Sequence, residues 1–328
     1  MSKHVNYGKY LISNGVMKIE KLLPGIQKNI SLKTFTTFKI GGKTKYFLVA
    51  KKKENIIKAV RMAKQINLPF FILGGGSNLL ISDEGFKGLV VKIQNVHCSH
   101  TVKYSAKGGS ASGGKIQDTE IYTEAGVPLS LLINKTIRNN LSGLEWAVGI
   151  PGTVGGAVHG NAGFPKESFG DIIKEVEVFD SKDLKIKKLN NKDCKFGYRE
   201  SIFKKRKNLI IISAILELKS GNKGEIKNKI QKYLEHRKAS QPLNFPSIGS
   251  IFKNPPKFFA GELIEKCNLK GKKIGNVKIS EKHANFIVNL GNGKANDVKK
   301  LINLIKNRVK NKFGVVLEEE IQYLGFQN

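Results

Sequence analysis

The hydrophobic positions of the first hundred residues predict a helix between short strands. Apolar residues at 56, 57, 60, 63 and 66 recur at the spacing of one helical face, which predicts a helix over 54–66. Apolar stretches predict strands over 45–50 and 69–73, and the segment 32–42, which ends in two glycines, predicts a strand that turns into 45–50. A weaker periodicity predicts a helix over 18–23. Strand, helix and strand in this order are typical of a crossover unit.

The rest of the chain is richer in strands until its last third. Short apolar runs predict one helix over 129–140 and strands over 90–93, 121–125, 171–180, 186–189 and 209–218. In the last third we predict strands over 286–290 and 315–317, a stop at Gly314, and helices over 225–238 and 297–313. The polar segment 220–224 marks a boundary. We therefore predict an α+β fold whose last third, residues 221–328, is a separate part.

The net charge of +31 comes from 57 Lys and Arg against 26 Asp and Glu, a balance that is typical of nucleic-acid-binding proteins. The lysines are spread along the whole chain instead of gathered in one arm or helix. A general compositional bias towards Lys, Asn and Ile therefore explains the charge better, and we predict no nucleic-acid partner. The positive field would still speed encounters with anionic small molecules.

Composition also bears on location and on metal sites. The longest apolar run, 209–218, is too short to span a membrane, and the N-terminus lacks the apolar core of a signal peptide. We therefore predict a cytoplasmic protein without membrane insertion. Cys98, Cys194 and Cys267 lie far apart, which indicates neither a disulfide framework nor a metal site.

The segment 149–163, GIPGTVGGAVHGNAG, is the first candidate for chemistry. Six glycines in fifteen residues leave few side chains, so the useful groups are those of the backbone, whose bare N–H groups can cradle a phosphate or a flat ring. The alternative is a mobile loop. A second glycine segment, 74–78, is neither a dinucleotide fingerprint nor a Walker loop, and by itself it would be a tight turn. Together, however, two glycine surfaces can close on one diphosphate.

Four polar clusters add candidate side chains. Tyr198 and Arg199 lie in the segment 194–204, which would be a charged surface turn if it stood alone. Prolines stiffen the segment 240–256 around Ser250, Lys253 and Asn254, which is typical of a binding loop. Ser250 lacks the surroundings of a hydrolase nucleophile, so a proton donor fits as well.

The other two clusters are charged. Arg237 and Lys238 end a predicted helix where they could meet a phosphate, although a solvated helix end is the alternative. Glu318, Glu319 and Glu320 are consecutive acids of the kind usually found on a surface. In an extended chain Glu319 points away from the other two, so at least one carboxylate faces inward.

In their order along the chain, these motifs resemble the UDP-N-acetylenolpyruvoylglucosamine reductase family, also called UDP-N-acetylmuramate dehydrogenase. The resemblance extends from about residue 32 to 325 and rests on eight motifs, which read TFKIGG, LGGGSNLL, GLEWAVGIPGTVGGAVHGNAG, YRESIFK, PSIGSIFKNP, AGELIE, KHANFIVN and LEEEIQYLG. It implies an FAD-binding region in two subdomains of the vanillyl-alcohol-oxidase (PCMH) type, residues 1–95 and 96–220. A smaller α+β substrate-binding domain, 221–328, follows.

The resemblance also implies a reaction. NADPH would reduce the FAD, which then reduces the enolpyruvyl double bond of a UDP-sugar in peptidoglycan precursor synthesis, a step that supports cell shape and division. By position, Ser250 resembles the proton donor, and Arg199 and Glu320 resemble the pair that binds and polarises the substrate carboxylate. Glu320 beside an anion would have a raised pKa.

The binding residues follow from the same resemblance. The UDP-sugar would contact Tyr198, Arg237, Lys253 and Asn254. FAD would lie on Gly41, Gly42, Gly74, Gly75, Gly76, Ser77, Asn78, Gly149, Ile150, Pro151, Gly152, Thr153, Gly155, Gly156, Ala157, Asn161 and Gly163.

Two departures from the family pattern stand out. Glu319 and Gln322 occupy positions where the family usually has proline and arginine, which leaves Glu318 as the alternative to Glu320. The polar segment 107–115 is longer than expected, and we assign it no role. No additional loop is apparent between 261 and 283, which is similar to the shorter, second type of the family. We expect a monomer.

Two other functions were weighed against this one. Another FAD oxidoreductase of the same fold, acting on a sugar or lactone, would keep the glycine segments but would not need the motifs around Ser250 and Arg199. A basic polyanion-binding protein would bind in a salt-sensitive manner and carry no chromophore.

Overall fold

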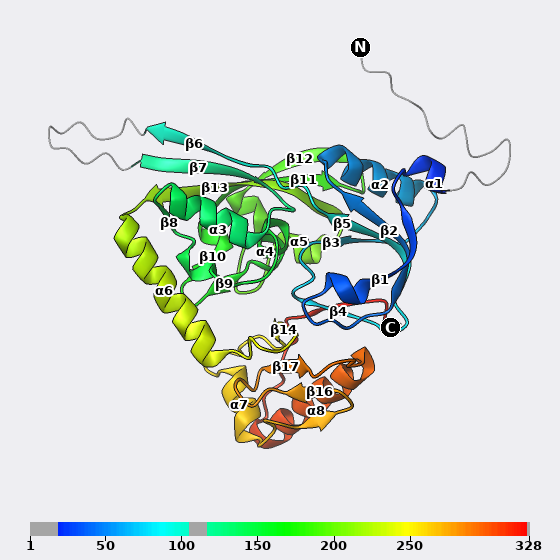
Figure 1. The fold of residues 1–328 in the computed structure, drawn as a ribbon, viewed down its shortest axis with the longest axis vertical. Helices are drawn as coiled ribbons and strands as arrows, with labels where there is room; N and C mark the ends of the chain where they lie inside the picture. Colours follow the sequence, from blue (N-terminus) through cyan, green and yellow to red (C-terminus); the bar gives the residue numbers. More distant parts are fainter. Residues whose placement is uncertain (1–18, 105–116, 327–328) are drawn as a thin grey trace, which may run out of the picture.

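A computed structural model describes residues 19–104 and 117–326 of the chain. The polar segment 107–115 lies outside the described residues. The molecule has an upper part built on two sheets and a smaller C-terminal part below them (Figure 1).

The N-terminal sheet has the strand order β1-β2-β5-β3. β1 (Gln27–Ser31) is antiparallel to β2 (Lys43–Ala50), whereas β2 and β3 (Phe70–Leu73) both run parallel to β5 (Phe86–Ile93). α2 (Lys53–Gln65) connects β2 to β3 and buries its apolar face, and a short α1 (Ile19–Leu22) precedes the sheet. The predicted crossover unit and both predicted helices are confirmed.

The predicted strand over 32–42 is wrong. The segment begins as a 3-10 helix, η2 (Leu32–Phe35), and continues without regular structure to Gly42. Leu32 is buried in the core of the N-terminal sheet, whereas Phe38 and Ile40 are buried in the C-terminal core. The apolar positions of this segment therefore reflect burial in two cores, not one face of a strand.

The central sheet is antiparallel and has the order β12-β11-β13-β7-β6. Its strands are β6 (Cys98–Tyr104), β7 (Gln117–Glu124), β11 (Ile173–Asp180), β12 (Lys185–Asn190) and β13 (Leu209–Ser220), and β8 (Leu141–Ser142) pairs with β13. Beneath this sheet lie α3 (Leu129–Arg138) and α4 (Val154–Gly160) (Figure 1). Most of the strands predicted for this part are confirmed.

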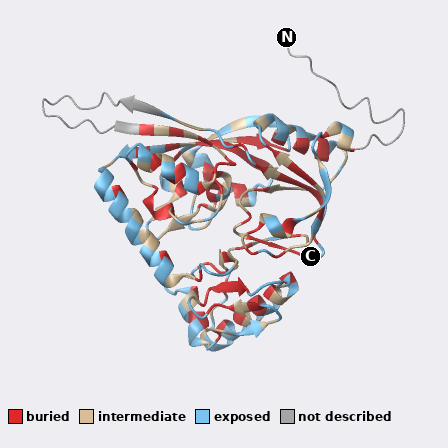
Figure 2. Ribbon diagram, viewed as in Figure 1, coloured by how far each residue is buried: buried red, intermediate tan, exposed pale blue. Residues whose placement is uncertain are grey.

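Short elements connect the strands of this region. They are η3 (Glu145–Ala147), β9 (Gly163–Phe164), β10 (Glu167–Ser168), η4 (Phe169–Asp171), η5 (Asn191–Cys194) and α5 (Ile202–Lys205). Buried residues of the N-terminal and central sheets, such as Val91 and Ile212, belong to one hydrophobic core. Figure 2 shows this buried band along both sheets.

The C-terminal part has its own core. The long helix α6 (Lys223–Ser240) leads down to it along one side of the molecule (Figure 1). A sheet of order β14-β17-β16-β15 packs with α7 (Ala260–Lys266) and α8 (Ala295–Phe313); its strands are β14 (Ser247–Ser250), β15 (Lys273–Ile274), β16 (Val277–Ile279) and β17 (Phe286–Asn289). Gly314 ends α8 in the left-handed conformation, as predicted.

The chain end returns to the N-terminal part. β18 (Gln322–Leu324) runs parallel to β4 (Leu79–Ile81). The predicted strand over 315–317 is wrong, because this segment forms no ladder, and its neighbour Glu319 makes only an isolated bridge with Phe252. β18 and β4 join the last residues of the chain to the second glycine segment.

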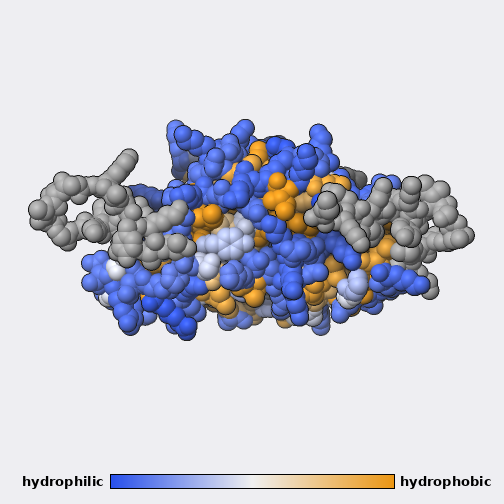
Figure 3. Space-filling model, turned by 90° about the horizontal axis from the view of Figure 1, so that it is seen from above, coloured by the Kyte–Doolittle hydropathy of each residue, from blue (hydrophilic) through white to orange (hydrophobic). Residues whose placement is uncertain are grey.

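The surface is predominantly polar. Hydrophilic residues cover most of the face seen from above, with apolar residues scattered between them (Figure 3). None of the helices in the described ranges is long and apolar enough to cross a membrane.

Candidate active site

The two glycine segments touch each other. A Cβ atom on Gly75 would lie 2.5 Å from the Cα atom of Gly152, and one on Gly74 would lie 2.8 Å from Oγ1 of Thr153. Both distances are shorter than any contact that a side chain tolerates, so only glycine allows this approach. The tertiary structure thus brings together the two surfaces that were predicted to act together.

Backbone N–H groups are available where the segments meet. Within the part of the chain that the structure describes, the N–H groups of Gly75, Gly76 and Ser77 donate to no protein atom. Unpaired N–H groups in consecutive positions form a typical anion-binding surface. The arrangement therefore fits the diphosphate of a dinucleotide such as FAD.

The segment 149–163 is not a simple loop, because α4 forms in its middle. Thr153 is the N-cap of α4, and its Oγ1 accepts a hydrogen bond from the Gly156 N–H at 3.5 Å. Gly155 lets α4 lie against the end of β7. Its N–H donates to the Ala125 carbonyl at 2.9 Å, and a Cβ atom on Gly155 would lie 2.8 Å from the Ala125 Cβ. The glycines thus serve packing as well as a ligand surface.

Three other predicted cofactor residues are packed against the protein. The Asn161 amide donates to the Gly197 carbonyl, and its oxygen accepts from the Gly170 N–H, both at 2.8 Å. Its side chain therefore holds neighbouring segments together. Gly41 and Gly42 pack closely against residues 81–85, at the turn that follows β4.

Lys92 was not predicted. It lies on β5, and its Nζ donates to the Gly74 carbonyl, so it holds the start of the second glycine segment. Burial lowers the pKa of Lys92. A single lysine at the end of an apolar strand carries no signal in the sequence.

Arg199 and Glu320, from opposite ends of the C-terminal half, form an ion pair. Arg199 Nε lies 2.9 Å from Glu320 Oε1, although Nε does not have hydrogen-bond geometry to any described group. Arg199 Nη2 donates to the Gly163 carbonyl at 3.0 Å, next to the first glycine segment. The backbone of Arg199 is left-handed (φ 55°) and Lys204 Nζ donates to its carbonyl at 2.8 Å, which stabilises an unusual conformation.

Glu320 is fixed by its backbone. Its N–H donates to the Ile251 carbonyl at 2.8 Å, and its carbonyl accepts from Asn78 Nδ2 at 3.1 Å. Burial raises the pKa of Glu320 above its ordinary value, and Arg199 only partly opposes this. The predicted rise is therefore already present without a substrate anion.

Glu318 and Glu320 point to one side and Glu319 to the other, as the alternation predicts. Glu318 pairs with Lys253, and Glu319 pairs with Lys306 of α8 at 2.7 Å. Glu318 is mostly exposed, whereas the side chain of Glu320 beside Arg199 is only 18% exposed.

Ser250 lies at the end of β14, two positions from Phe252, which bridges to Glu319. Its hydroxyl forms no hydrogen bond with any residue in the described ranges. The preceding Gly249 adopts a positive φ of 78°, and a Cβ there would meet no atom within 4 Å. The hydroxyl is therefore free to act on a ligand.

Lys253, predicted to bind substrate, is occupied by protein carboxylates. It is only 8% exposed, and its Nζ lies 2.6 Å from Oε1 of both Glu200 and Glu318. The Asn254 N–H donates to the exposed Tyr198 hydroxyl at 3.2 Å, and the Asn254 Oδ1 accepts from the Ala260 N–H at 3.0 Å. Tyr198 and Asn254 thus lie together.

Arg237 is buried without a carboxylate partner among the described residues. Its Nη2 donates to the Trp146 carbonyl at 3.4 Å, and its Nε has no acceptor. Burial and the nearby Arg199 lower the pKa of Arg237. A buried guanidinium is ordinarily paired, so an anionic ligand would complete this site.

His159 and Gln322 were also not predicted. Gln322 Nε2 lies 3.3 Å from His159 Nδ1 and joins α4 to β18. Burial lowers the pKa of His159 to about 4, so the imidazole is neutral at neutral pH. Gln322 was noted only as a departure from a family pattern, and its partner could not be inferred from the chain order.

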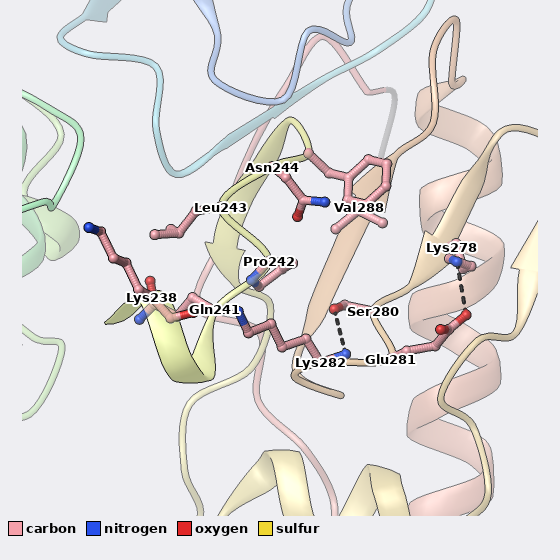
Figure 4. A pocket seen from close by; sticks show the side chains of 11 residues that line it. Lys238, Gln241, Pro242, Leu243, Asn244, Lys278, Ser280, Glu281, Lys282 and Val288 are labelled. Atoms are coloured by element: carbon pink, nitrogen blue, oxygen red, sulfur yellow. Dashed lines mark hydrogen bonds and ion pairs between the residues drawn. The ribbon is translucent and has the colours of Figure 1, made fainter. Parts of the chain in front are cut away.

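A cavity of about 420 Å³ opens between the end of α6 and the C-terminal sheet (Figure 4). Lys238, Lys278 and Lys282 bring positive charge to it, Gln241 and Asn244 add amide groups, and Glu281 pairs with Lys278 at 2.9 Å. Of these residues the sequence pointed only to Lys238. No group of three or more His, Cys, Asp or Glu suited to a metal occurs in the described ranges.

Two protein families match the chain. Residues 44–190 match the FAD binding domain family, and residues 241–324 match the C-terminal domain of UDP-N-acetylenolpyruvoylglucosamine reductase.

Curated relatives carry that reductase name and are similar over nearly their whole length. The protein of Caldanaerobacter subterraneus is 41% identical over 297 residues, which cover 90% of this chain and 93% of the relative. That of Clostridium tetani is 36% identical over 321 residues, 98% of both chains. The crystal structure of the reductase of Thermus caldophilus superposes with a TM-score of 0.71 at 34% identity, and the match covers 90% of this chain and 97% of that chain.

Proposed function

The chain belongs to the UDP-N-acetylenolpyruvoylglucosamine reductase family, and we propose that it reduces the enolpyruvyl group of that UDP-sugar to give UDP-N-acetylmuramate. The cofactor is FAD and the reductant is NADPH. The reaction supplies a precursor of peptidoglycan, which supports cell shape and cell division. One observation carries the proposal: Arg199 pairs with Glu320, whose N–H donates to the residue after Ser250, and both Arg199 and Glu320 contact the glycine segments.

We propose that FAD lies on residues 74–78 and 149–163, where it supplies the hydride chemistry. Gly75, Gly76 and Ser77 would donate their unpaired N–H groups to its diphosphate. Gly74 and Gly152 act by allowing the two segments to touch. Lys92 holds the carbonyl of Gly74 and keeps this surface in shape.

Arg199 would bind the carboxylate of the enolpyruvyl group. Negative charge grows on the carboxylate oxygens as a hydride reaches the double bond, so a fixed guanidinium stabilises the transition state more than the ground state. Glu320 pairs with Arg199 and would hold it in place, and a substrate carboxylate beside Glu320 would raise the pKa of Glu320 further. The Ser250 hydroxyl would then give its proton to the neighbouring carbon.

The remaining residues would hold the sugar nucleotide. Tyr198 and Asn254 lie together near Arg199, and the buried Arg237 lacks an anionic partner in the described part of the chain. The lysines of the cavity next to α6 offer a place for phosphate groups. We also propose the division 1–95, 96–220 and 221–328 for the FAD-binding subdomains and the substrate domain, and a monomeric, cytoplasmic enzyme.

The test follows the flavin spectrum without oxygen. The purified protein should show flavin absorbance that bleaches with NADPH and returns when the enolpyruvyl sugar nucleotide is added. The Ser250→Ala variant should be reduced by NADPH at the normal rate but be reoxidised by the substrate several orders of magnitude more slowly. Unchanged reoxidation in this variant would remove Ser250 from the mechanism.

The same experiment separates the alternatives. An oxidoreductase acting on another sugar or lactone would bleach with a reductant and fail to recover with this substrate. A polyanion-binding protein would be colourless and could not be reconstituted with FAD.

A further inference from the structure

We propose that Lys253 does not bind substrate but is a positioning residue, which, together with Glu200, holds Arg199 in register with Ser250 and Glu320. This inference rests on the proposed function, because it concerns the geometry of the same site.

The three catalytic residues lie on segments that are joined in different ways. The segment around Ser250 is joined to that of Glu320 by backbone hydrogen bonds: Lys253 N–H donates to the Glu318 carbonyl at 2.9 Å, and Glu320 N–H donates to the Ile251 carbonyl at 2.8 Å. Backbone bonds of this kind fix the register between two extended segments. Backbone hydrogen bonds therefore set the register of the Ser250 segment against the Glu320 segment.

The turn that carries Arg199 is joined to these segments by side chains. In the described part of the chain, three polar contacts join this turn to them: the Arg199–Glu320 pair, the Tyr198–Asn254 hydrogen bond and the Glu200–Lys253 pair. The Arg199–Glu320 pair consists of groups that would also bind the substrate carboxylate. The second depends on Tyr198, which is 57% exposed. The Glu200–Lys253 pair remains as a contact between two charged side chains that have no role in the proposed reaction.

The Glu200–Lys253 pair is shielded mainly on its lysine side, because the side chain of Glu200 is 35% exposed and that of Lys253 only 10%. Lys253 is 8% exposed, and its Nζ lies 2.6 Å from Glu200. Lys253 lowers the pKa of Glu200, so the carboxylate stays charged. Lys204 lies 3.6 Å from the same carboxylate and also donates to the Arg199 carbonyl, so one charge cluster holds the left-handed turn.

Glu318 contributes less to this arrangement. Its side chain is 71% exposed, where water and salt weaken an ion pair. The two carboxylates 2.6 Å from Lys253 Nζ neutralise its positive charge, so Lys253 would attract a phosphate only weakly. The geometry therefore favours positioning over substrate binding.

The test compares Lys253→Met, Glu200→Gln and the double variant in the complete FAD-loaded enzyme. We expect reoxidation by the enolpyruvyl sugar nucleotide to fall by about a hundredfold in each single variant, because a shift of about 1 Å at Arg199 has this effect. The Kd of the substrate should change far less, and reduction by NADPH should not change. The double variant should be no slower than either single one, and Lys253→Arg should restore part of the rate.

A phosphate-binding Lys253 gives a different result. Lys253→Met would then weaken substrate binding, whereas Glu200→Gln would strengthen it by freeing the lysine charge. Such opposite shifts in Kd, or wild-type reoxidation in both variants, would overturn the proposal. The control is Lys306→Met, which removes a similar pair with Glu319 on the other side of the same segment and should leave reoxidation unchanged.

A substrate-free measurement keeps the two proposals separate. Thermal unfolding of the wild type, the two single variants and the double variant reports whether Glu200 and Lys253 are coupled. Additive effects on stability would overturn the pairing, and this result does not depend on which substrate the wild type reduces. Failure of the wild type to recover its flavin colour with the enolpyruvyl substrate would contradict the proposed function alone.

Discussion

At the scale of single residues, the site contains buried charges that are compensated to different extents. Arg199 and Glu320 pair at 2.9 Å, whereas Arg237 has no carboxylate partner in the described ranges. His159 needs no partner charge at neutral pH, because burial lowers its pKa to about 4 and the imidazole is neutral. Burying an uncompensated charge is costly, so a ligand anion at Arg237 would stabilise the folded protein.

The neutral His159 leads to a prediction about stability and pH. Its folded pKa of about 4 lies below the ordinary 6.5, so between these values the unfolded chain binds a proton that the folded chain does not. The free energy of unfolding should therefore fall as the pH drops from 6.5 towards 4, by about 3 kcal/mol in total. His159→Gln, which cannot titrate, should lose this part of the pH dependence.

Urea unfolding of wild type and variant at about pH 7 and about pH 4.5 measures the difference. His97→Gln is the control, because His97 is exposed. Parallel pH profiles for the wild type and His159→Gln would show that His159 is protonated in the folded protein.

At the scale of elements, the site depends on two glycine segments in contact. The glycines of 74–78 allow β3 to end against the start of α4, and Gly155 allows α4 to lie against Ala125 at the end of β7. Asn78 then links the second segment to the chain end, through its hydrogen bonds with Glu320 and Gln322. The second glycine segment and the Arg199–Glu320 pair are thus connected through Asn78.

This contact can be tested with a pair of alanine variants. A methyl group on Gly75 would lie 2.5 Å from Gly152, so Gly75→Ala must push the segments apart. Overpacking of this kind costs about 1 to 3 kcal/mol, which should lower FAD affinity by about ten- to a hundredfold. Gly160→Ala, also at a glycine of this region, meets no atom within 4 Å and should retain FAD.

Release of FAD during dialysis, followed by absorbance and fluorescence, measures the effect. Equal retention by Gly75→Ala and the wild type would mean that the two segments do not need to touch.

At the scale of the whole molecule, the site forms where distant parts of the chain meet. The N-terminal and central sheets share one core, the C-terminal part has another, and the last residues return to pair with β4. The molecule also carries a net charge of +31. Its substrates by family, NADPH and a UDP-sugar, are anions.

The charge predicts a dependence on salt. A positive field raises the encounter rate with anions, and the screening length shortens to about 10 Å at about 0.1 M salt. We therefore expect kcat/KM for NADPH to fall as salt rises, with little change in kcat. Steady-state rates across a salt series check this, and a kcat/KM that does not change would show that the charge has no role in encounter.

Some of this architecture follows from local sequence alone. Helices α2, α3 and α8 and most long strands have periodicities that each segment displays by itself, because one face is buried. Helix α6 was also predicted from its apolar residues, although only Ile226 and Arg237 of it are buried. The glycine segments and the order of the motifs were likewise sufficient to indicate FAD and the reductase family. Each helix, strand or motif is a pattern within one short stretch of sequence, so it can be recognised without knowledge of the fold.

Only the tertiary structure decided what the buried positions face. Segment 32–42 reads as a strand because its apolar residues are buried, yet they enter two different cores. The sequence predicts that Lys253 binds a ligand, yet Lys253 forms an ion pair with Glu200, which lies 53 residues earlier. His159 meets Gln322 across 163 positions. A sequence pattern reports that a position is buried or charged, but its partner is set by long-range packing, which no local pattern contains.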